Sequence, residues 1–259
     1  MHLTPDIIAL LALVAFVAGF IDALAGGGGL LTLPALLAAG IPPVAAIATN
    51  KLQSTFGTGG AFLAFARKGH IDFRRFAWPG IAALIGSAAG AFTLQLVDPT
   101  FLKAFIPLLL IAMAIYFIAA PKMSDVDRHA RLGQAGLCAS IAGIGFYDGF
   151  FGPGTGSFFT TLLVAAGGLG LVRAIAHTKF LNFLTNVAAV TMMIAGGHVI
   201  WLLGGAMAVA SVAGNQAGAL AAMRFGGKGV RPLLVVMSLA LTVKLLSDPA
   251  NPLRAMLFG

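Results

Sequence analysis

The sequence predicts an all-α integral membrane protein built from two inverted-topology repeats of about five membrane segments each. Three observations favour this fold. Of the 259 residues, 59% are hydrophobic and only 9% are charged, whereas soluble domains carry about 25% charged residues. Apolar runs recur almost from end to end, separated by short polar breaks. Motifs of the first half also return in the second half at a nearly constant spacing.

The repeat is carried by four pairs of motifs. GFIDALAGGGG at 19–29 aligns with GFYDGFFGPGT at 145–155, a shift of 126 positions. The other three pairs share a shift of 128: ATNKL at 48–52 with AHTKF at 176–180, Gly69-His70 with Gly197-His198, and GSAAGA at 86–91 with GNQAGA at 214–219. We therefore interpret residues 1–259 as a single transmembrane domain with repeat one at 1–120, a linker at 121–131 and repeat two at 132–259.

Hydropathy places five membrane segments in each repeat. They are 5–25, 29–40, 44–65, 78–96 and 102–119 in repeat one, and 132–151, 155–167, 171–195, 201–222 and 232–247 in repeat two. The second segment of each repeat covers only about a dozen residues, roughly 18 Å of helix against about 30 Å of hydrocarbon. We therefore expect broken or half-helices there, beside the Gly-rich tracts.

Basic residues orient the two repeats. Ten of the sixteen Lys and Arg residues fall in three breaks: Arg67, Lys68, Arg74 and Arg75; Lys122, Arg128 and Arg131; and Arg224, Lys228 and Arg231. The positive-inside rule places these breaks in the cytoplasm. The break at 195–200, the counterpart of 66–77, has no basic residue. Matching loops are thus expected on opposite sides, which requires inverted repeats with both termini outside.

Glycine tracts precede the short second segment of each repeat, at Gly26 to Gly29 and at Gly152, Gly154 and Gly156. Inside a membrane, unwound backbone is tolerated where it lines a cavity or meets a ligand. A helix that starts there points its positive end at that ligand. We expect the substrate to contact Gly27, Gly28, Gly154 and Thr155. Close helix packing or a simple turn is the alternative.

Polar clusters open the third segment of each repeat. Their candidate substrate-binding members are Asn50, Lys51, Gln53, Ser54, His177, Thr178, Lys179 and Asn182. Helical spacing lets much of each cluster share one face, and lipid would exclude that face, so it must turn inward. Ammonium, amide and hydroxyl donors suit an oxyanion. Alternatively, each lysine extends along the helix to a nearby membrane interface.

Asp22 and Asp148 are acidic residues well inside apolar runs, at matching places in the two repeats. They are candidates for proton coupling or for a countercharge. The alternative is a structural cap, or an internal pair with Lys51 and Lys179. His177 replaces Thr49 of repeat one. It could act as a proton relay or ligand donor, or it could be simply hydrogen-bonded.

Several other classes of function fit the sequence poorly. The net charge is +8, but the basic residues form no dense run, so no nucleic-acid partner is expected. One cysteine, Cys138, excludes an intramolecular disulfide and a cysteine-rich metal site. HExxH and CxxC motifs are absent, and we expect no enzyme activity, metal or cofactor. A membrane-embedded enzyme or assembly factor of sulfur metabolism, or an anion channel, is kept as the alternative.

At these motifs the sequence resembles the TauE/SafE, or sulfite exporter, family. The resemblance rests on GFIDALAGGGG with Ala48 to Lys51, on the Gly-His loops, and on GFYDGFFGPGTGS with His177 to Asn182, and it extends over essentially the whole chain. It implies transport of sulfite, a sulfonate or a sulfoacetate-like compound, coupled to an ion gradient. We therefore expect a multi-pass inner-membrane transporter whose partners are a small anion and the lipid bilayer. A homodimer is left open.

Overall fold

The structure, a computed structural model, describes residues 3–25, 27–119 and 126–225 of the chain. This part of the chain is almost entirely helical. Its helices are α1 (Pro5–Ala25), α2 (Gly29–Ala38), α3 (Pro43–Arg67), α4 (Phe73–Leu96), α5 (Pro99–Ala119), α6 (Gln134–Phe150), α7 (Thr155–Ala165), α8 (Leu171–Ala195) and α9 (Trp201–Phe225). Each coincides with one of the predicted segments, and the remaining segment, 232–247, lies outside the described residues.

One predicted boundary was wrong by several residues. Helix α4 begins at Phe73 and not at 78, because the Asp72 side chain caps it by accepting a hydrogen bond from the Arg75 N–H at 2.9 Å. Arg74 and Arg75, which the sequence analysis assigned to the break, therefore lie in the first turn of the helix. Trp78 consequently sits inside α4, whereas Trp201 is the first residue of α9, as expected.

The two second segments are short helices, as the sequence predicted. Helix α2 has 10 residues and α7 has 11, which corresponds to roughly 15 Å of length at 1.5 Å per residue. That is about half of the hydrocarbon thickness. Gly154, directly before α7, has a φ of +85°, a left-handed conformation that favours glycine. Each short helix thus begins at a glycine tract.

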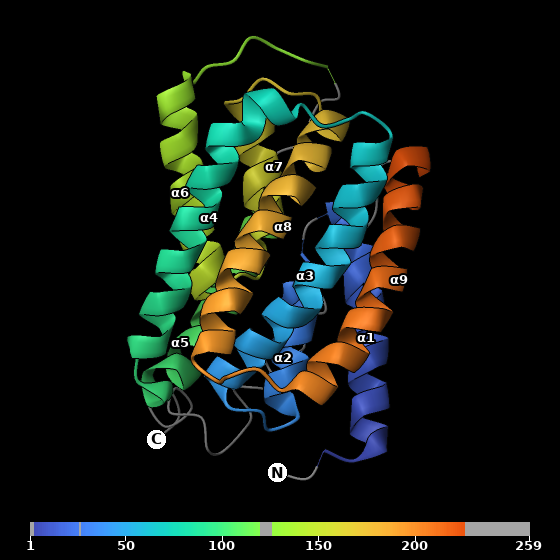
Figure 1. Cartoon of the computed structure of the whole chain (residues 1–259), viewed down its shortest axis with the longest axis vertical. Helices are drawn as coiled ribbons and strands as arrows, with labels where there is room; N and C mark the ends of the chain where they lie inside the picture. The colour runs from blue at the N-terminus through green and yellow to red at the C-terminus, as the bar shows by residue number, and fades with distance from the viewer. Residues whose placement is uncertain (1–2, 26, 120–125, 226–259) are drawn as a thin grey trace.

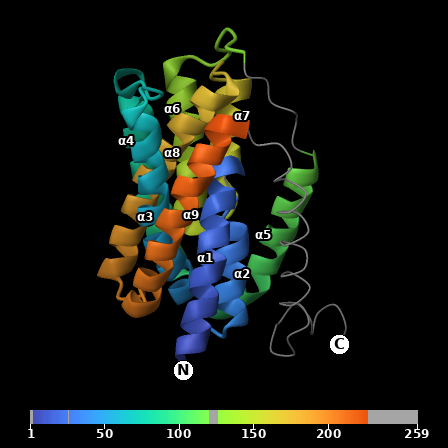
Figure 2. The same cartoon turned by 90° about the vertical axis from the view of Figure 1, so that its right-hand side faces the viewer.

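Helices α3 and α8 cross the middle of the bundle (Figure 1). Helices α1 and α9 pack along one side of this central pair, and α4 and α6 pack along the other. Each flanking pair therefore combines a helix of repeat one with a helix of repeat two. Figure 2 shows α5 at one side of the described helices, where it contacts α3.

The bundle has polar and charged side chains buried among an apolar core, and apolar side chains on its outer faces. Buried residues include lysine, aspartate, asparagine and glutamine side chains, while large hydrophobic side chains on the outer helix faces are exposed, among them Leu13, Ile85 and Val209. Such a continuous apolar surface suits lipid and not water. By length and composition, three described helical stretches can cross a membrane: Pro5–Ala23, Phe73–Leu96 and Leu171–Ala195. The chain is accordingly a membrane protein.

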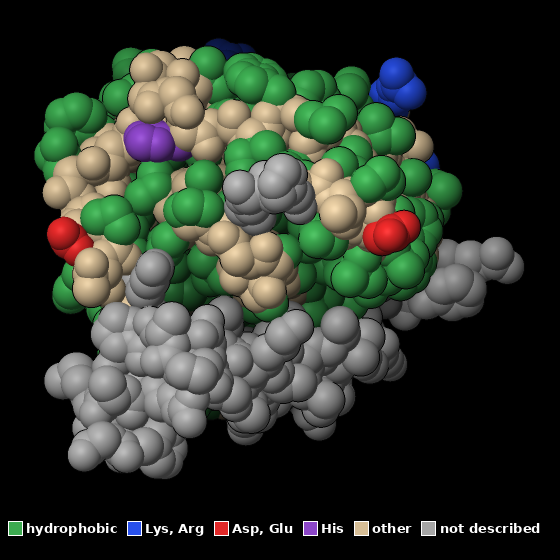
Figure 3. Space-filling view, turned by 90° about the horizontal axis from the view of Figure 1, so that it is seen from below, with side chains coloured by type: hydrophobic (Ala, Val, Ile, Leu, Met, Phe, Trp, Pro, Cys, Tyr) green, Lys and Arg blue, Asp and Glu red, His purple; other side chains and the backbone are tan. Residues whose placement is uncertain are grey.

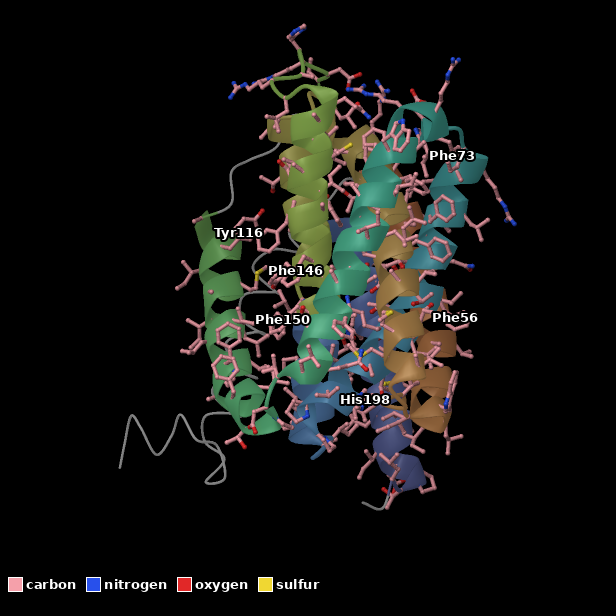
Figure 4. All side chains as sticks on the ribbon, turned by 60° about the vertical axis from the view of Figure 1, so that its left-hand side comes forward. Phe56, Phe73, Tyr116, Phe146, Phe150 and His198 are labelled. Atoms are coloured by element: carbon pink, nitrogen blue, oxygen red, sulfur yellow. The ribbon has the colours of Figure 1, made fainter. Side chains whose placement is uncertain are left out.

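The connections α3–α4 and α8–α9 lie at opposite ends of the bundle (Figure 1). Figure 4 shows the same relation through its labels, with Phe73 near the upper end and His198 near the lower end. The lower end, viewed in Figure 3, presents mostly hydrophobic and uncharged surface with few charged side chains. Basic residues instead flank the α3–α4 connection, at Arg67, Lys68, Arg74 and Arg75.

Candidate functional site

Two buried ion pairs join the repeats at the centre of the bundle. Lys51 Nζ of α3 lies 2.9 Å from Asp148 Oδ1 of α6. Lys179 Nζ of α8 lies 2.8 Å from Asp22 Oδ2 of α1. Each lysine is therefore paired with the aspartate of the other repeat. Of the alternatives for the aspartates, the structure shows the internal pair.

Both lysines keep their ammonium groups inside the protein. Each residue is 1% exposed, so neither extends to a membrane interface. Lys51 also donates to Asn186 Oδ1 at 3.3 Å, and Lys179 also donates to the Asp22 carbonyl oxygen. Hydrogen bonds of this kind are what a buried charge needs in addition to its counterion.

The glycine tracts make room for the ion pairs. A Cβ at Gly152 would lie 2.7 Å from Lys51 Nζ, and Gly152 also has a φ of +96°. A Cβ at Gly28 would lie 2.8 Å from the Asp22 Cβ. The Gly28 N–H, at the start of α2, donates to Asp22 Oδ1 at 3.3 Å. The positive end of this short helix thus contacts a carboxylate of the site.

A small cavity adjoins the ion pairs. Its volume open to the centres of water molecules is about 40 Å³, room for roughly three waters at ~10–15 Å³ each. Ten predicted site residues line it: Asp22, Gly28, Asn50, Lys51, Gln53, Ser54, Asp148, Gly154, Thr155 and Asn182. The sequence therefore identified most of the cavity wall.

Four predicted site residues do not line the cavity: Gly27, His177, Thr178 and Lys179. The Gly27 carbonyl accepts a hydrogen bond from the Leu30 N–H in the first turn of α2. The Thr178 hydroxyl lies 3.1 Å from the Thr160 hydroxyl of α7. Lys179 is held behind the wall by Asp22. These residues support the short helices and the ion pairs.

His177 anchors a connection. Its Nε2 accepts a hydrogen bond from the Asp72 N–H at 3.0 Å, and its Nδ1 lies 2.7 Å from the Arg173 carbonyl oxygen. The ring is therefore neutral, with its hydrogen on Nδ1. In repeat one, Thr49 Oγ1 accepts from the Ile200 N–H at 3.2 Å. The acceptors Thr49 and His177 correspond at the 128-residue shift, as do the donors Asp72 and Ile200. Each repeat therefore anchors the connection that follows the third helix of the other repeat.

Eight further residues line the cavity: Ala18, Gly19, Thr58 and Asn215, which sequence reasoning missed, and Asn186 together with Gly29, Gly152 and Gly156 of the glycine tracts. Asn186 accepts from Lys51 and donates to the Thr58 hydroxyl at 3.4 Å. Asn215 is 2% exposed. One signal could have found Asn215: it is an amide side chain in the middle of an apolar segment, and such residues seldom face lipid.

The wall carries surplus hydrogen-bond acceptors. Among the described residues, four buried side-chain oxygens have no hydrogen-bond partner: Gln53 Oε1, Asp148 Oδ2, Asn182 Oδ1 and Asn215 Oδ1. All four residues line the cavity. Buried polar atoms are nearly always satisfied by protein, water or a ligand. Water or a polar ligand in the cavity would supply the missing hydrogen-bond donors.

Comparisons with known proteins identify a family and several relatives of the chain. A family model described as sulfite exporter TauE/SafE matches residues 11–245. The "Probable membrane transporter protein ORF9" of a Sinorhizobium species is 46% identical over 249 residues, which cover 96% of this chain and 95% of that protein. A "Probable membrane transporter protein" of Haemophilus influenzae is 42% identical over 250 residues, covering 96% and 98%. The "Probable membrane transporter protein YfcA" of Escherichia coli strain K12 is 41% identical over 248 residues, covering 95% and 91%.

No solved structure matches the chain. The family model nevertheless extends over most of the sequence, and the relatives align along nearly their full lengths. This confirms the resemblance noted at the glycine tracts and the lysine motifs. The apolar outer surface, the polar centre and these matches lead to one conclusion: the chain belongs to the sulfite exporter TauE/SafE family and is a membrane transporter.

Proposed function

We propose that the protein is a secondary transporter that moves sulfite or a small organosulfonate across the bacterial inner membrane, coupled to a proton gradient. The observation that carries this proposal is the pair of crossed ion pairs, Lys51 with Asp148 and Lys179 with Asp22, beside a small polar cavity. The relatives are named only as membrane transporters, so the anion is inferred from the chemistry of the site and the family description.

Charge balance explains why a proton would accompany the anion. In the structure, two ammonium groups face two carboxylates, and their formal charges cancel. An anion entering alone would leave a net negative charge in a low-dielectric interior, at a cost of several kcal/mol or more. A proton on Asp148 or Asp22 cancels that charge. It also frees a lysine to bind the oxyanion, with the N-terminal ends of α2 and α7 adding positive potential.

Inverted repeats would let the cavity open alternately to the two sides of the membrane. Two observations support this topology: matching connections lie at opposite ends of the bundle (Figure 1), and each flanking helix pair mixes the two repeats. The basic residues at one end favour a cytoplasmic location for the α3–α4 connection. In transporters of this kind, a substrate site at the repeat interface is exposed alternately as one repeat rocks against the other.

Proton coupling is tested by sulfite flux in proteoliposomes with and without an imposed pH gradient. We expect the gradient to drive net uptake by the wild type. Asp148→Asn and Asp22→Asn are tested separately, and the variant that removes the protonated carboxylate should lose the pH dependence of net flux. Counterflow exchange should persist in part in that variant, because the amide cannot release a proton. Wild-type flux that follows only the anion gradient would contradict coupling and favour a channel.

The lysines are tested by anion affinity. Hydrogen bonds to charged groups contribute about 1.5–3 kcal/mol, so removal of one ammonium should weaken binding by roughly 10- to 150-fold. We expect this loss in Lys51→Met and in Lys179→Met, measured by calorimetric titration with sulfite in lipid nanodiscs. Lys68→Met is the matched control, since Lys68 is exposed at the C-terminal cap of α3. Wild-type affinity in both site variants would place the anion elsewhere.

A further inference from the structure

One wall of the cavity is formed by amide groups that the charge-balance mechanism does not use. Gln53 of α3 donates through Nε2 to Ser211 Oγ of α9 at 2.8 Å. Asn215, one turn further along α9, donates through Nδ2 to the Ser211 carbonyl oxygen at 3.1 Å. Gln53, Ser211 and Asn215 are 4%, 0% and 2% exposed. We call Gln53 and Asn215, which line the cavity, together with Ser211, which links them, the amide wall.

The amide wall contains two buried acceptor oxygens without a hydrogen-bond partner among the described residues, Gln53 Oε1 and Asn215 Oδ1. The Asn215 Nδ2 faces a backbone carbonyl, which can only accept, so the amide orientation is fixed and Oδ1 is the atom left over. Gln53 Oε1 is likewise buried with no partner among the described residues. An acceptor buried without a donor is unfavourable, so a donor from a guest would complete this wall.

Glycines show that the fold accommodates this wall at close range. A Cβ at Gly57 of α3 would lie 2.3 Å from Ser211 Oγ and 2.6 Å from Asn215 Nδ2. A Cβ at Gly19 of α1 would lie 2.8 Å from the same Asn215 atom. Any side chain at either position would displace the amides. The glycines of α3 and α1 thus leave room for Ser211 and Asn215 at this point. The hydrogen-bonding capacity of Asn215 is only partly used among the described residues.

The other repeat lacks an equivalent wall. At the 128-residue shift, Gln53 corresponds to Leu181 and Asn215 corresponds to Ser87. Leu181 is fully buried among apolar side chains. The Ser87 hydroxyl is occupied, because it donates to the Thr185 carbonyl oxygen at 2.7 Å. The ion pairs are therefore common to both repeats, whereas the group formed by Gln53, Ser211 and Asn215 is not repeated; in repeat two the unpartnered amide oxygen is that of Asn182.

We propose that the amide wall is a second subsite, which accepts a hydrogen bond from a hydroxyl or amine group of the transported anion. The substrate class is then a small anion with a donor group at the end opposite its charge, and the wall fixes its orientation. This inference rests on the proposed function, in which the anionic group occupies the same cavity near the lysines. The cavity is small, so a substrate of this class must be short.

The test compares two probes that differ by one hydroxyl group, ethanesulfonate and 2-hydroxyethanesulfonate. Their dissociation constants are measured by calorimetry with the full chain in lipid nanodiscs. The wild type should bind the hydroxylated probe about ten-fold more tightly, since its hydroxyl satisfies a buried acceptor. Gln53→Leu and Asn215→Ser each introduce the residue of the other repeat. Both should reduce the preference, taken as the ratio of the two dissociation constants within each variant, to within about two-fold.

Gln216→Leu is the matched control, because Gln216 is the exposed neighbour of Asn215 on α9 and should keep the preference. Thermal unfolding establishes that each variant folds, and either wall variant suffices for the test. Equal wild-type affinity for both probes would overturn the second subsite and leave the proposed anion site standing. A preference that persists in both wall variants would also overturn it. If neither probe binds but sulfite does, the second subsite is overturned and the proposed anion site stands; binding of none of the three would overturn both proposals.

Discussion

At the scale of single residues, the two ion pairs differ in their contact with the surroundings. The side chains of Lys51 and Asp148 are 2% and 5% exposed, whereas the Asp22 side chain is 17% exposed. A charge that loses its buried partner costs about 3–5 kcal/mol, and contact with water reduces that cost. Removing one partner of the first pair should therefore cost more stability than removing one partner of the second.

We expect Lys51→Met to lower the free energy of unfolding by about 3–5 kcal/mol, because Asp148 is left buried without its counterion. Adding Asp148→Asn should recover a large part of this loss, since a neutral amide needs no counterion. Lys179→Met should cost less than Lys51→Met. The free energies of unfolding of the wild type, the two single variants and the double variant are measured by denaturant unfolding in detergent micelles. Equal stability of Lys51→Met and the double variant would show that the pair is uncoupled.

At the scale of the helices, glycines allow close contact between the two helices within each flanking pair, α4 with α6 and α1 with α9. A Cβ at Gly90 of α4 would lie 2.0 Å from the Phe146 carbonyl oxygen of α6, whose side chain Figure 4 labels. A Cβ at Gly214 of α9 would lie 2.0 Å from the Phe16 carbonyl oxygen of α1. Small residues at helix interfaces allow such close backbone approach in membranes. The same device thus serves both sides of the bundle.

Replacement of either glycine by alanine should separate its helix pair and cost roughly 1–3 kcal/mol or more. We expect this for Gly90→Ala and Gly214→Ala in thermal unfolding experiments. Gly205→Ala, on α9 with no atom within 4 Å of the added Cβ, is the control and should gain up to about 1 kcal/mol of helix propensity. If Gly214→Ala were as stable as Gly205→Ala, the close contact would carry no energetic weight.

The two loop anchors give an element-scale prediction with a reciprocal control. His177→Ala removes the acceptor of the Asp72 N–H, and Thr49→Val removes the acceptor of the Ile200 N–H. A hydrogen bond contributes about 0.5–1.5 kcal/mol, so each amide should exchange its hydrogen roughly 2- to 12-fold faster in its own variant. The other amide should be unchanged. Faster exchange of both amides in both variants would indicate general loosening.

At the scale of the whole molecule, the proposed inverted topology predicts the side from which each loop is accessible. In a Cys138→Ala background, a cysteine at His70 should react with a membrane-impermeant reagent only from the cytoplasm. A cysteine at His198 should react only from outside, because the matching connections lie at opposite ends of the bundle. Labelling of intact cells and of inverted vesicles distinguishes the two sides. Reaction of both positions from one side would exclude inverted repeats.

Much of the fold could be predicted from the sequence because the helices are mostly apolar runs bounded by turn residues. Helix α8 begins and ends where hydropathy placed it, at Leu171 and Ala195. The start of α4 was predicted wrongly because arginines next to an apolar run in a membrane protein indicate a loop. Only the Asp72 cap shows that the helix already includes Arg74 and Arg75. A cap of this kind depends on local backbone geometry, which hydropathy does not report.

The sequence by itself determined the class, the family, the duplication and the residue types of the site, because composition and motif spacing are local properties. Only the tertiary structure decided that Lys51 meets Asp148 and that Lys179 meets Asp22. Each repeat contains both a lysine and an aspartate, so pairing within a repeat fits the sequence equally well. Pairing between repeats follows from the packing of α3 and α8 at the centre, since buried charges persist only where folding places a counterion within reach.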